Sequence, residues 1–358
     1  MNDQSEGKKN KKRFFEYGFP VGFLPSGSLR SIADVAGVTV GHVTKIEGDD
    51  VRTGITIVDP GIKDIYNNKI PAAYYAGNGT GKIAGSAQIE ELGVLEAPIA
   101  LTSTLYVGTV TRGMIELVLS QKVLTLPQTV NVFVGECNDG ILNNIYKNPI
   151  VEDDVRVAYE NRSAQFAIGS VGAGTGTRVF SWKGGIGTAS RIIEVAVKKY
   201  TIGALVQTNY GGAPEVLGVP IGKLFDKTDY KGIVPDTDGS CMIVLATDMP
   251  LTARQLRRLA KRGFMGLAKT GTIMRTVSGD FAVAFSTSRN GVEGSGLVGK
   301  CIGDDDLTGV FLAAAEAVEE SVYDALFAGE TMIGRSGNTL EAAPIDTIVS
   351  LLEKYHEK

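Results

Sequence analysis

The chain has 358 residues, of which 43% are hydrophobic and 21% are charged, so it can bury a large core. A balance of 36 Lys and Arg against 40 Asp and Glu gives a net charge of -4, which argues against nucleic acid or an anionic membrane as a partner. The three cysteines lack the spacing of a disulfide framework, and no stretch resembles a signal peptide or a membrane span. The sequence therefore predicts a cytoplasmic protein with no nucleic-acid partner and no membrane partner.

The first half of the sequence predicts an N-terminal segment with few contacts, followed by strands and one helix. Residues 1 to about 13 are polar and basic, and they are expected to have few contacts. Residues 37–46 have the composition of an early strand, and alternation at 130–135 predicts another. The stretch after Pro71 that runs through Leu92 has helical spacing of its apolar residues.

The second half predicts more strands and two long helices. Period-two alternation predicts strands at 191–200, 201–209 and 280–287, the first two joined as a hairpin. Apolar spacing predicts helices at 252–268 and 307–327. Because strands and helices are grouped and do not strictly alternate, the pattern indicates an α+β fold with helices outside stacked sheets.

Only two histidines occur, and this limits the kinds of active site that the chain can build. His356 lies in the charged C-terminal tail, and His42 lies on the early strand, where a hydrogen-bonded structural histidine is the simpler interpretation. A catalytic triad would have to use His42, and a metal site based on histidine would lack ligands. If the protein is an enzyme, its general base is therefore expected to be another group.

Three stretches resemble ligand-binding motifs without satisfying them. "GNGTGK" (77–82) lacks the first glycine and the final Ser or Thr of a phosphate-binding loop. "GAGTGT" (172–177) lacks the third glycine of a dinucleotide fingerprint and is better explained as a turn. "ARQLRRLAKR" (253–262) is explained by a solvated helix face.

The stretch "DTDGSCMIVLATD" (236–248) places Gly239 and Ser240 at the start of an apolar run that predicts a buried strand. A serine hydroxyl needs a base, and without histidine the α-amine of the serine itself could serve, because a chain terminus titrates near pH 7.7 to 8.0. The amine becomes free only if the chain is cut between Gly239 and Ser240. Taken alone, the stretch is better explained by a turn and the start of a strand.

The wider sequence resembles a known family over residues 30 to about 345. The matching motifs include the region from Ser240 to Gly271, together with "DVAGVTVGHVT", "VGECNDG", "VQTNYGG", "SGDFAVAFST" and "ETMIGRSGNTLEAAP". In this order they resemble the DmpA-like self-cleaving serine aminopeptidases, which include L-aminopeptidase/D-esterases and β-peptidyl aminopeptidases.

The resemblance implies roles for particular residues. Ser240 matches the nucleophile, released by autocleavage after Gly239. Asn209 matches the donor to the oxyanion, and Ser278 and Asp280 match a hydroxyl and acidic pair beside the nucleophile. Glu136 matches an acidic residue near the amino group of the substrate. Some relatives carry a tyrosine close to the place where Cys137 and Asn138 stand here.

The same resemblance implies a four-layer α-β-β-α sandwich, shared with ornithine acetyltransferases, and a homotetramer that needs no metal or other cofactor. Residues 1–29 are then a flexible N-terminal segment, and residues 30–358 form a single catalytic domain. The chain would be cut into 1–239 and 240–358. The substrate would be a small peptide, an amino-acyl amide or an ester.

Two other functions remain open at this level. Ornithine acetyltransferases share the self-cleaving architecture but use a threonine nucleophile as a rule, which Ser240 does not match. A protein that keeps the fold, binds a ligand and never cleaves itself is the second alternative.

Overall fold

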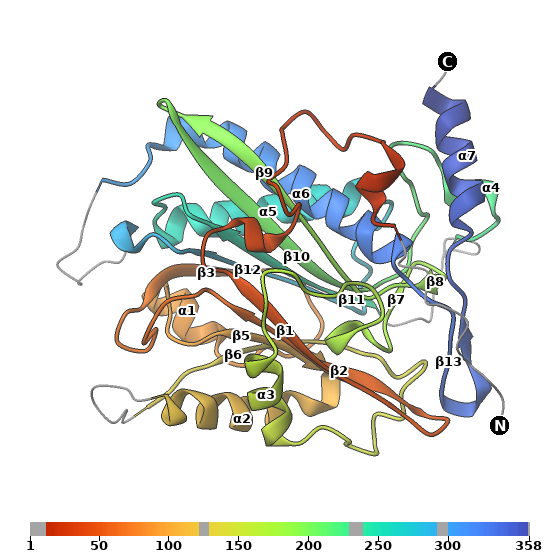
Figure 1. Cartoon of the computed structure of the whole chain (residues 1–358), viewed down its shortest axis with the longest axis horizontal. Helices are drawn as coiled ribbons and strands as arrows, with labels where there is room; N and C mark the ends of the chain where they lie inside the picture. The colour runs from red at the N-terminus through yellow and green to blue at the C-terminus, as the bar shows by residue number, and fades with distance from the viewer. Residues whose placement is uncertain (1–11, 122–128, 229–238, 292–299, 357–358) are drawn as a thin grey trace.

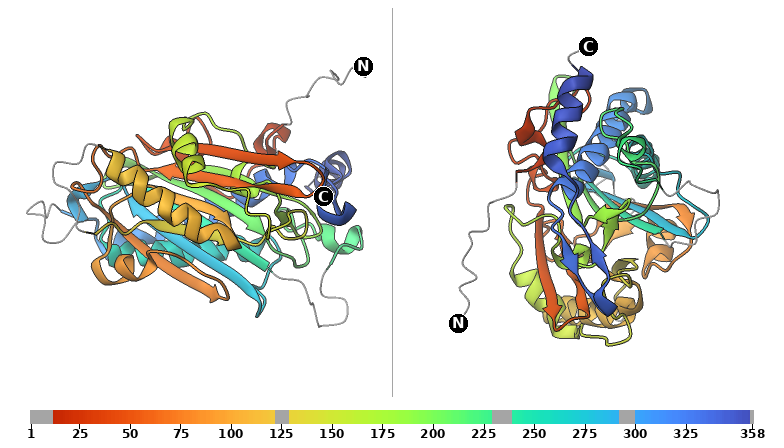
Figure 2. Two further views of the ribbon diagram at one scale, coloured as in Figure 1. Left: turned by 90° about the horizontal axis from the view of Figure 1, so that it is seen from below. Right: turned by 90° about the vertical axis from the view of Figure 1, so that its right-hand side faces the viewer.

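The computed structural model describes residues 12–121, 129–228, 239–291 and 300–356. Two β-sheets are stacked face to face, and helices cover their outer faces (Figures 1 and 2). The predicted α+β fold and its α-β-β-α layers are thus confirmed. Among the described residues, no helix combines the length and the apolar character needed to cross a lipid bilayer.

The smaller sheet has four strands in the order β1-β2-β5-β6. Its strands are β1 (Thr39–Glu47), β2 (Val51–Asp59), β5 (Ile99–Ser103) and β6 (Phe133–Cys137). Two helices, α2 (Val107–Ser120) and α3 (Glu152–Glu160), cover its outer face, where apolar side chains of both helices pack on β2, β5 and β6.

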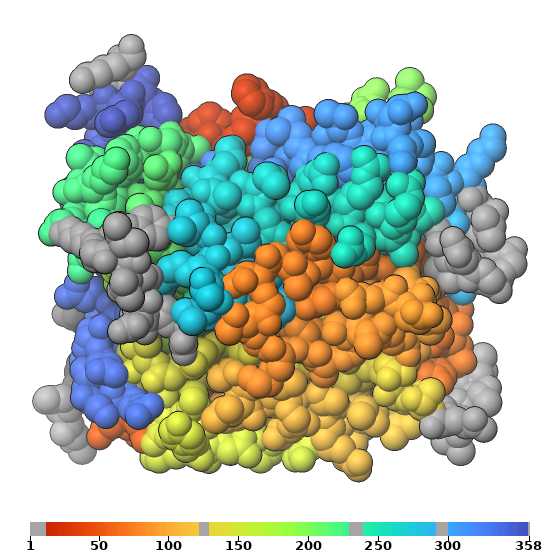
Figure 3. Space-filling model, turned by 180° about the vertical axis from the view of Figure 1, so that it is seen from behind, coloured from red at the N-terminus to blue at the C-terminus, as the bar shows by residue number. Residues whose placement is uncertain are grey.

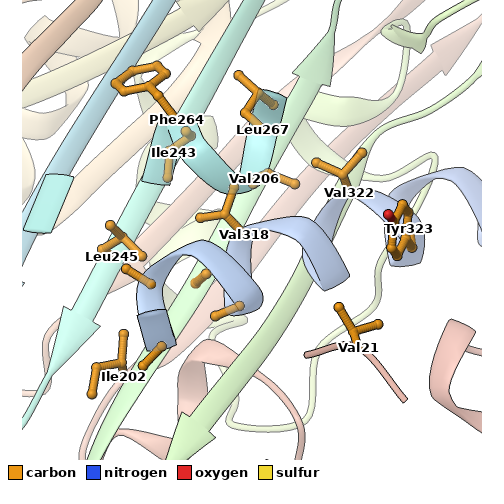
Figure 4. Close-up of a cluster of buried hydrophobic side chains, with 14 of the residues drawn as sticks. Val21, Ile202, Val206, Ile243, Leu245, Phe264, Leu267, Val318, Val322 and Tyr323 are labelled. Carbon is orange, nitrogen blue, oxygen red and sulfur yellow. The ribbon is translucent and has the colours of Figure 1, made fainter. Parts of the chain in front are cut away.

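The larger sheet has six strands in the order β4-β3-β12-β11-β10-β9. Its strands are β3 (Ile70–Gly79), β4 (Val94–Leu95), β9 (Ile186–Val195), β10 (Lys198–Asn209), β11 (Gly239–Thr247) and β12 (Ser278–Ser286). Helices α5 (Ala253–Lys269) and α6 (Leu307–Phe327) cover its outer face. Figure 4 shows Ile243 and Leu245 of β11 beside Phe264 of α5 and Val318 of α6.

Short elements complete the fold at its edges. They are α1 (Ser86–Leu92), α4 (Ile221–Leu224), α7 (Ile345–His356), and the strand pairs β7 (Arg178–Val179) with β8 (Trp182–Lys183) and β13 (Met332–Ile333) with β14 (Thr339–Leu340). From behind, the orange segment around β3 and α1 lies between α5 and α2 (Figure 3).

Most of the predicted elements are present. The helices at 252–268 and 307–327 correspond to α5 and α6, and the predicted hairpin corresponds to β9 and β10. The hairpin turn places Ala196 and Val197 at φ values of 48° and 63°, the left-handed conformation that a tight two-residue turn uses. The strand predicted at 130–135 lies slightly later, as β6.

The helix predicted after Pro71 is wrong over most of its length. Residues Ile70–Gly79 form β3, which pairs antiparallel with β12 at positions such as Ala73 opposite Ala284, and only Ser86–Leu92 is helical. The apolar run "PAAYYA" satisfies helical spacing, but pairing with a central strand and burial on both faces decide its conformation.

The N-terminal segment is packed on α6 from residue 13 onward. Arg13 donates to the Asp324 carboxylate through Nε at 2.8 Å, and the backbone N–H of Phe14 donates to the same carboxylate at 3.0 Å. Phe14 is fully buried, so the part of the predicted flexible segment that the structure describes is held by specific contacts. Residues 1–11 lie outside the described residues.

A buried ion cluster joins α6 to β9. Arg191 of β9 donates through Nε to Glu316 at 3.0 Å, and its Nη1 lies 2.7 Å from Glu320, with all three side chains at most 3% exposed. Because buried charges are costly unless they are paired, this cluster fixes where the helix lies on the sheet.

Candidate active site

Ser240 is the second residue of β11, at the end of a strand in the middle of the larger sheet. Side chains alternate along a strand, and Met242 belongs to the core between the sheets while Cys241 belongs to the core under the helices. Ser240 therefore faces the space between the two sheets, where it is only 5% exposed.

Asn209 lies opposite Ser240 at the end of β10. Its Nδ2 donates to Ser240 Oγ at 3.0 Å and to the carbonyl oxygen of Asn138 at 2.8 Å. The backbone N–H of Arg178 donates to its Oδ1 at 3.4 Å, which fixes the orientation of the amide. The structure thus directs an amide donor toward the serine hydroxyl.

Ser278 and Asp280 lie on β12, which runs parallel to β11 and pairs Gly239 with Ser278. A Cβ atom built on Gly239 would lie 2.8 Å from Ser278 Oγ, so glycine at this position leaves room for that hydroxyl. Among the described residues, neither Ser278 Oγ nor Asp280 Oδ2 has a hydrogen-bond partner, although both atoms are buried.

The carboxyl group of Asp280 has an altered acidity. Burial raises the pKa of Asp280 to about 6, while the Ser278 hydroxyl and the Arg275 guanidinium act in the opposite direction. Asp280 lies opposite Cys241 and alternates in phase with Ala282, which packs under the helices, so it faces away from the space that Ser240 faces. This placement puts the Asp280 carboxyl on the opposite face of the sheet from the Ser240 hydroxyl, to which Asn209 donates.

Glu136 comes from the other sheet, at the end of β6. Strand β6 crosses close to β11, since a Cβ atom built on Gly135 would lie 2.4 Å from Met242 Cε. Glu136 is 5% exposed, and its Oε1 accepts from the backbone N–H of Lys82 at 3.3 Å and from Lys82 Nζ at 3.4 Å. No hydrogen bond among the described residues joins Glu136 to Ser240.

Cys137 lies beside Ser240. Burial raises the pKa of the Cys137 thiol well above its usual range, and the Ser240 hydroxyl is the largest influence in the opposite direction. Its Sγ also donates to the carbonyl oxygen of Gln207 at 3.7 Å. A neutral, buried thiol therefore occupies the position beside Ser240, close to where relatives were expected to carry a tyrosine.

Asn78 is a residue that sequence reasoning did not select. Its Nδ2 donates to the carbonyl oxygens of Arg275 at 2.7 Å and of Ser278 at 2.5 Å, so it holds the turn that leads into β12. The stretch 77–82, which resembles a phosphate-binding loop, thus supports both Ser278 and Glu136. Nothing local in the sequence could show this, because its contacts lie 54 and 200 residues away.

His42 takes no part in this site. Its Nδ1 lies 2.9 Å from Thr56 Oγ1 and its Nε2 lies 3.1 Å from the carbonyl oxygen of Ala167. Burial lowers the pKa of His42 to about 4, so the ring is neutral near pH 7. Its interpretation as a structural strand histidine is confirmed.

Comparison with known proteins gives consistent matches over nearly the whole chain. The profile of peptidase family S58 matches residues 30–340. A curated relative, the beta-peptidyl aminopeptidase BapA of Sphingosinicella microcystinivorans, is 34% identical over 369 residues, which cover 95% of this chain and 91% of that protein.

Two solved structures are similar throughout. The PH0078 protein from Pyrococcus horikoshii OT3 is 38% identical with a TM-score of 0.89, covering 96% of this chain and 99% of that one. The L-aminopeptidase D-Ala-esterase/amidase from Ochrobactrum anthropi, described as a variant of the Ntn-hydrolase fold, is 32% identical with a TM-score of 0.87, covering 97% and 99%. The chain therefore belongs to peptidase family S58 and is an aminopeptidase built on the Ntn-hydrolase fold.

Proposed function

We propose that the chain cuts itself between Gly239 and Ser240, and that Ser240 then removes N-terminal residues from small peptides, amino-acyl amides or esters. The observation that supports this most directly is the hydrogen bond from Asn209 Nδ2 to Ser240 Oγ at the head of β11. It pairs a nucleophile with a fixed donor at the place where negative charge would develop.

Self-cleavage would proceed through an ester. Ser240 Oγ attacks the carbonyl carbon of Gly239, the bond from that carbon to the Ser240 nitrogen breaks, and the nitrogen takes up a proton to become a free amine. Water then hydrolyses the ester and leaves a carboxylate on Gly239. The close approach of Ser278 Oγ to Gly239 supports a role for this hydroxyl in positioning the bond.

The free amine then replaces the missing histidine. It accepts the proton of Ser240 Oγ as the oxygen attacks the carbonyl carbon of the substrate, and it returns the proton to the leaving amine. Asn209 Nδ2 transfers its hydrogen bond from Oγ to the oxyanion of the tetrahedral intermediate. Water releases the acyl group by the same steps.

Asp280 and Ser278 would act on the amine. A carboxylate on the strand that pairs with β11 next to Ser240 would stabilise the ammonium that forms when the amine takes up a proton. The buried Oδ2 of Asp280 has no hydrogen-bond partner among the described residues, so it is available to this ammonium.

Glu136 would bind the amino group that defines an aminopeptidase substrate. A nearly buried carboxylate at the end of β6 suits an ammonium, because charge-assisted hydrogen bonds are strong where water is excluded. The relatives named for beta-peptidyl substrates make β-amino acyl groups the first class to test here.

Intact mass of the purified protein tests the cut. The wild-type chain is expected as two pieces divided after Gly239, and Ser240→Ala as one uncut chain without activity on amino-acyl p-nitroanilides. Ser120→Ala, at the far end of α2, serves as the matched control and is expected to be cut normally. A folded wild-type chain that stays intact while hydrolysing these substrates would overturn the mechanism.

A homotetramer in the cytoplasm is part of the same proposal. The tetramer rests on the family resemblance, and the location rests on the scattered free cysteines. Light scattering after size-exclusion chromatography would show a mass four times that of the chain, and cell fractionation would show the location.

A further inference from the structure

Lys82 forms an ion pair with Glu136, and the mechanism above gives Lys82 no role. Lys82 Nζ lies 3.4 Å from Glu136 Oε1 and donates to Thr104 Oγ1 at 2.6 Å. The Lys82 side chain is 53% exposed, whereas that of Glu136 is 6% exposed. The pair therefore presents an accessible ammonium next to an almost buried carboxylate.

The two oxygens of Glu136 have different surroundings. Oε1 accepts from the backbone N–H and from Nζ of Lys82, while no hydrogen bond in the described part of the chain reaches Oε2. The loop 77–82 lies close to both Glu136 and Phe281 at Gly81, which has no side chain. A Cβ atom built on Gly81 would lie 3.1 Å from both Glu136 Oε1 and Phe281 Cε2. A substrate ammonium that binds Glu136 would use Oε2.

Such an ammonium would lie next to a second positive charge. Two like charges held close together repel each other, and Lys82 is held in place by Thr104 as well as by Glu136. A carboxylate on the substrate, close to its own ammonium, would remove this repulsion and add an attraction to Lys82. The charges then alternate in sign, from the Glu136 carboxylate to the substrate ammonium, the substrate carboxylate and the Lys82 ammonium.

We propose that Lys82 selects substrates whose N-terminal residue carries a carboxylate on the same carbon as its free amine, as an isoaspartyl residue does. This inference rests on the proposed binding of the substrate amine by Glu136. In such a residue the nitrogen and the carboxylate oxygens lie about 3 Å apart by covalent geometry, which is similar to the 3.4 Å between Lys82 Nζ and Glu136 Oε1. Its scissile carbonyl is one carbon further from the amine than in an α-peptide, as in the β-peptides named for the relatives.

Three p-nitroanilides test the inference on the purified, self-cleaved protein. They are β-alanyl p-nitroanilide, isoaspartyl p-nitroanilide, and the same isoaspartyl compound with its α-carboxylate replaced by a carboxamide. The wild type is expected to hydrolyse the carboxylate compound at least tenfold more efficiently than the carboxamide, through a lower KM. This preference is expected to fall as salt is raised from about 0.05 M to 1 M, because salt screens exposed charges.

Two lysine variants separate recognition from folding. Lys82→Met is expected to raise the KM for the carboxylate compound at least tenfold more than it raises the KM for β-alanyl p-nitroanilide. Lys82→Arg is expected to keep part of the preference. Lys147→Met removes an equally exposed lysine that pairs with Asp50 far from the site, and it is expected to change neither substrate.

Equal rates on the carboxylate and carboxamide compounds, unaffected by salt, would overturn the inference and leave the proposed function standing. An equal loss on all three compounds in Lys82→Met would also overturn it, because Lys82 would then only support Glu136. Failure of the wild type on every amino-acyl p-nitroanilide would overturn the proposed function as well.

Discussion

Asn209 divides its two amide hydrogens between Ser240 Oγ and the carbonyl oxygen of Asn138, so one of them is held in place while the other can follow the reacting oxygen. Asn209→Ala is expected to lower kcat by roughly 100- to 1,000-fold with little change in KM, as removal of an oxyanion donor does. Steady-state kinetics on an amino-acyl p-nitroanilide measure this. Asn338→Ala, which removes an exposed amide bonded to Ile141, is the control. A loss confined to KM would contradict the assigned role.

The acidity of Asp280 predicts a pH profile. Since the pKa of Asp280 is raised to about 6 and its charged form is the one that stabilises an ammonium, kcat/KM is expected to fall as the pH drops below about 6. Asp280→Asn is expected to lower kcat/KM at pH 8 by roughly a hundredfold and to remove the inflection near pH 6. Asp153→Asn, at an exposed ion pair with Arg156, is expected to keep the inflection. An inflection that survives in Asp280→Asn would assign it to another group.

At this scale the sequence predicted the residue types better than their contacts. Ser240, Asn209 and Ser278 could be selected because the resemblance supplied positions and the shortage of histidine excluded an imidazole base. Asn78 and Lys82 could not, because their partners come from strands that only the fold brings near. The side chains of Asp280 and Ser240 lie on opposite faces of the sheet because of the register between β11 and β12, and no local sequence pattern specifies this register.

Helix α6 approaches β9 so closely that a side chain between them is excluded. A Cβ atom built on Gly187 would lie 1.8 Å from the backbone oxygen of Ser321, and the backbone cannot move aside as a side chain can. Gly187→Ala is therefore expected to destabilise the fold by about 2–3 kcal/mol or more. Gly108→Ala on α2, where nothing lies within 4 Å, is expected to be neutral or to stabilise by about 0.5–1 kcal/mol. Urea denaturation of both in the uncut Ser240→Ala background measures the difference, and equal stabilities would contradict it.

Whether a helix or strand could be predicted from the sequence depended on how its residues are buried. Helix α5 was predictable because it has a polar and an apolar side along its length. Helix α6 was predictable because its apolar residues recur at helical spacing, although all of its residues from Glu316 to Phe327 are buried. Strands β9 and β10 were predictable because they alternate near a tight turn. Strand β3 was not, because residues buried on both faces of a central strand lose the alternation that distinguishes strand from helix.

At the scale of the whole molecule, three buried carboxyl groups predict whether the free energy of unfolding rises or falls with pH. Burial raises the pKa values of Asp139, Asp280 and Asp324 to about 6, above the usual aspartate value of about 3.9. Between these two values the folded chain binds more protons than the unfolded chain, so these groups lower the free energy of unfolding as the pH rises from about 4 to 6. Above about pH 6 their contribution is constant.

Asp139→Asn tests this without touching the proposed catalytic groups. In the uncut Ser240→Ala background, the variant is expected to lose less stability than its parent between pH 4 and 6, by roughly 2 kcal/mol. Chemical denaturation at several pH values measures it, with the exposed Asp49→Asn as control. An unchanged slope in Asp139→Asn would show that its carboxyl does not titrate in this range.

The order of strands in the larger sheet gives the proposed cut a thermodynamic meaning. Strands β11 and β12 belong to the piece that begins at Ser240, yet they lie between β3 and β10 of the other piece. The two pieces cannot part without breaking the middle of the sheet, so the cut protein still unfolds as one unit. Refolding of the cut protein, however, becomes an encounter between two chains. The yield of refolding would then depend on protein concentration, which the folding of the uncut chain does not require.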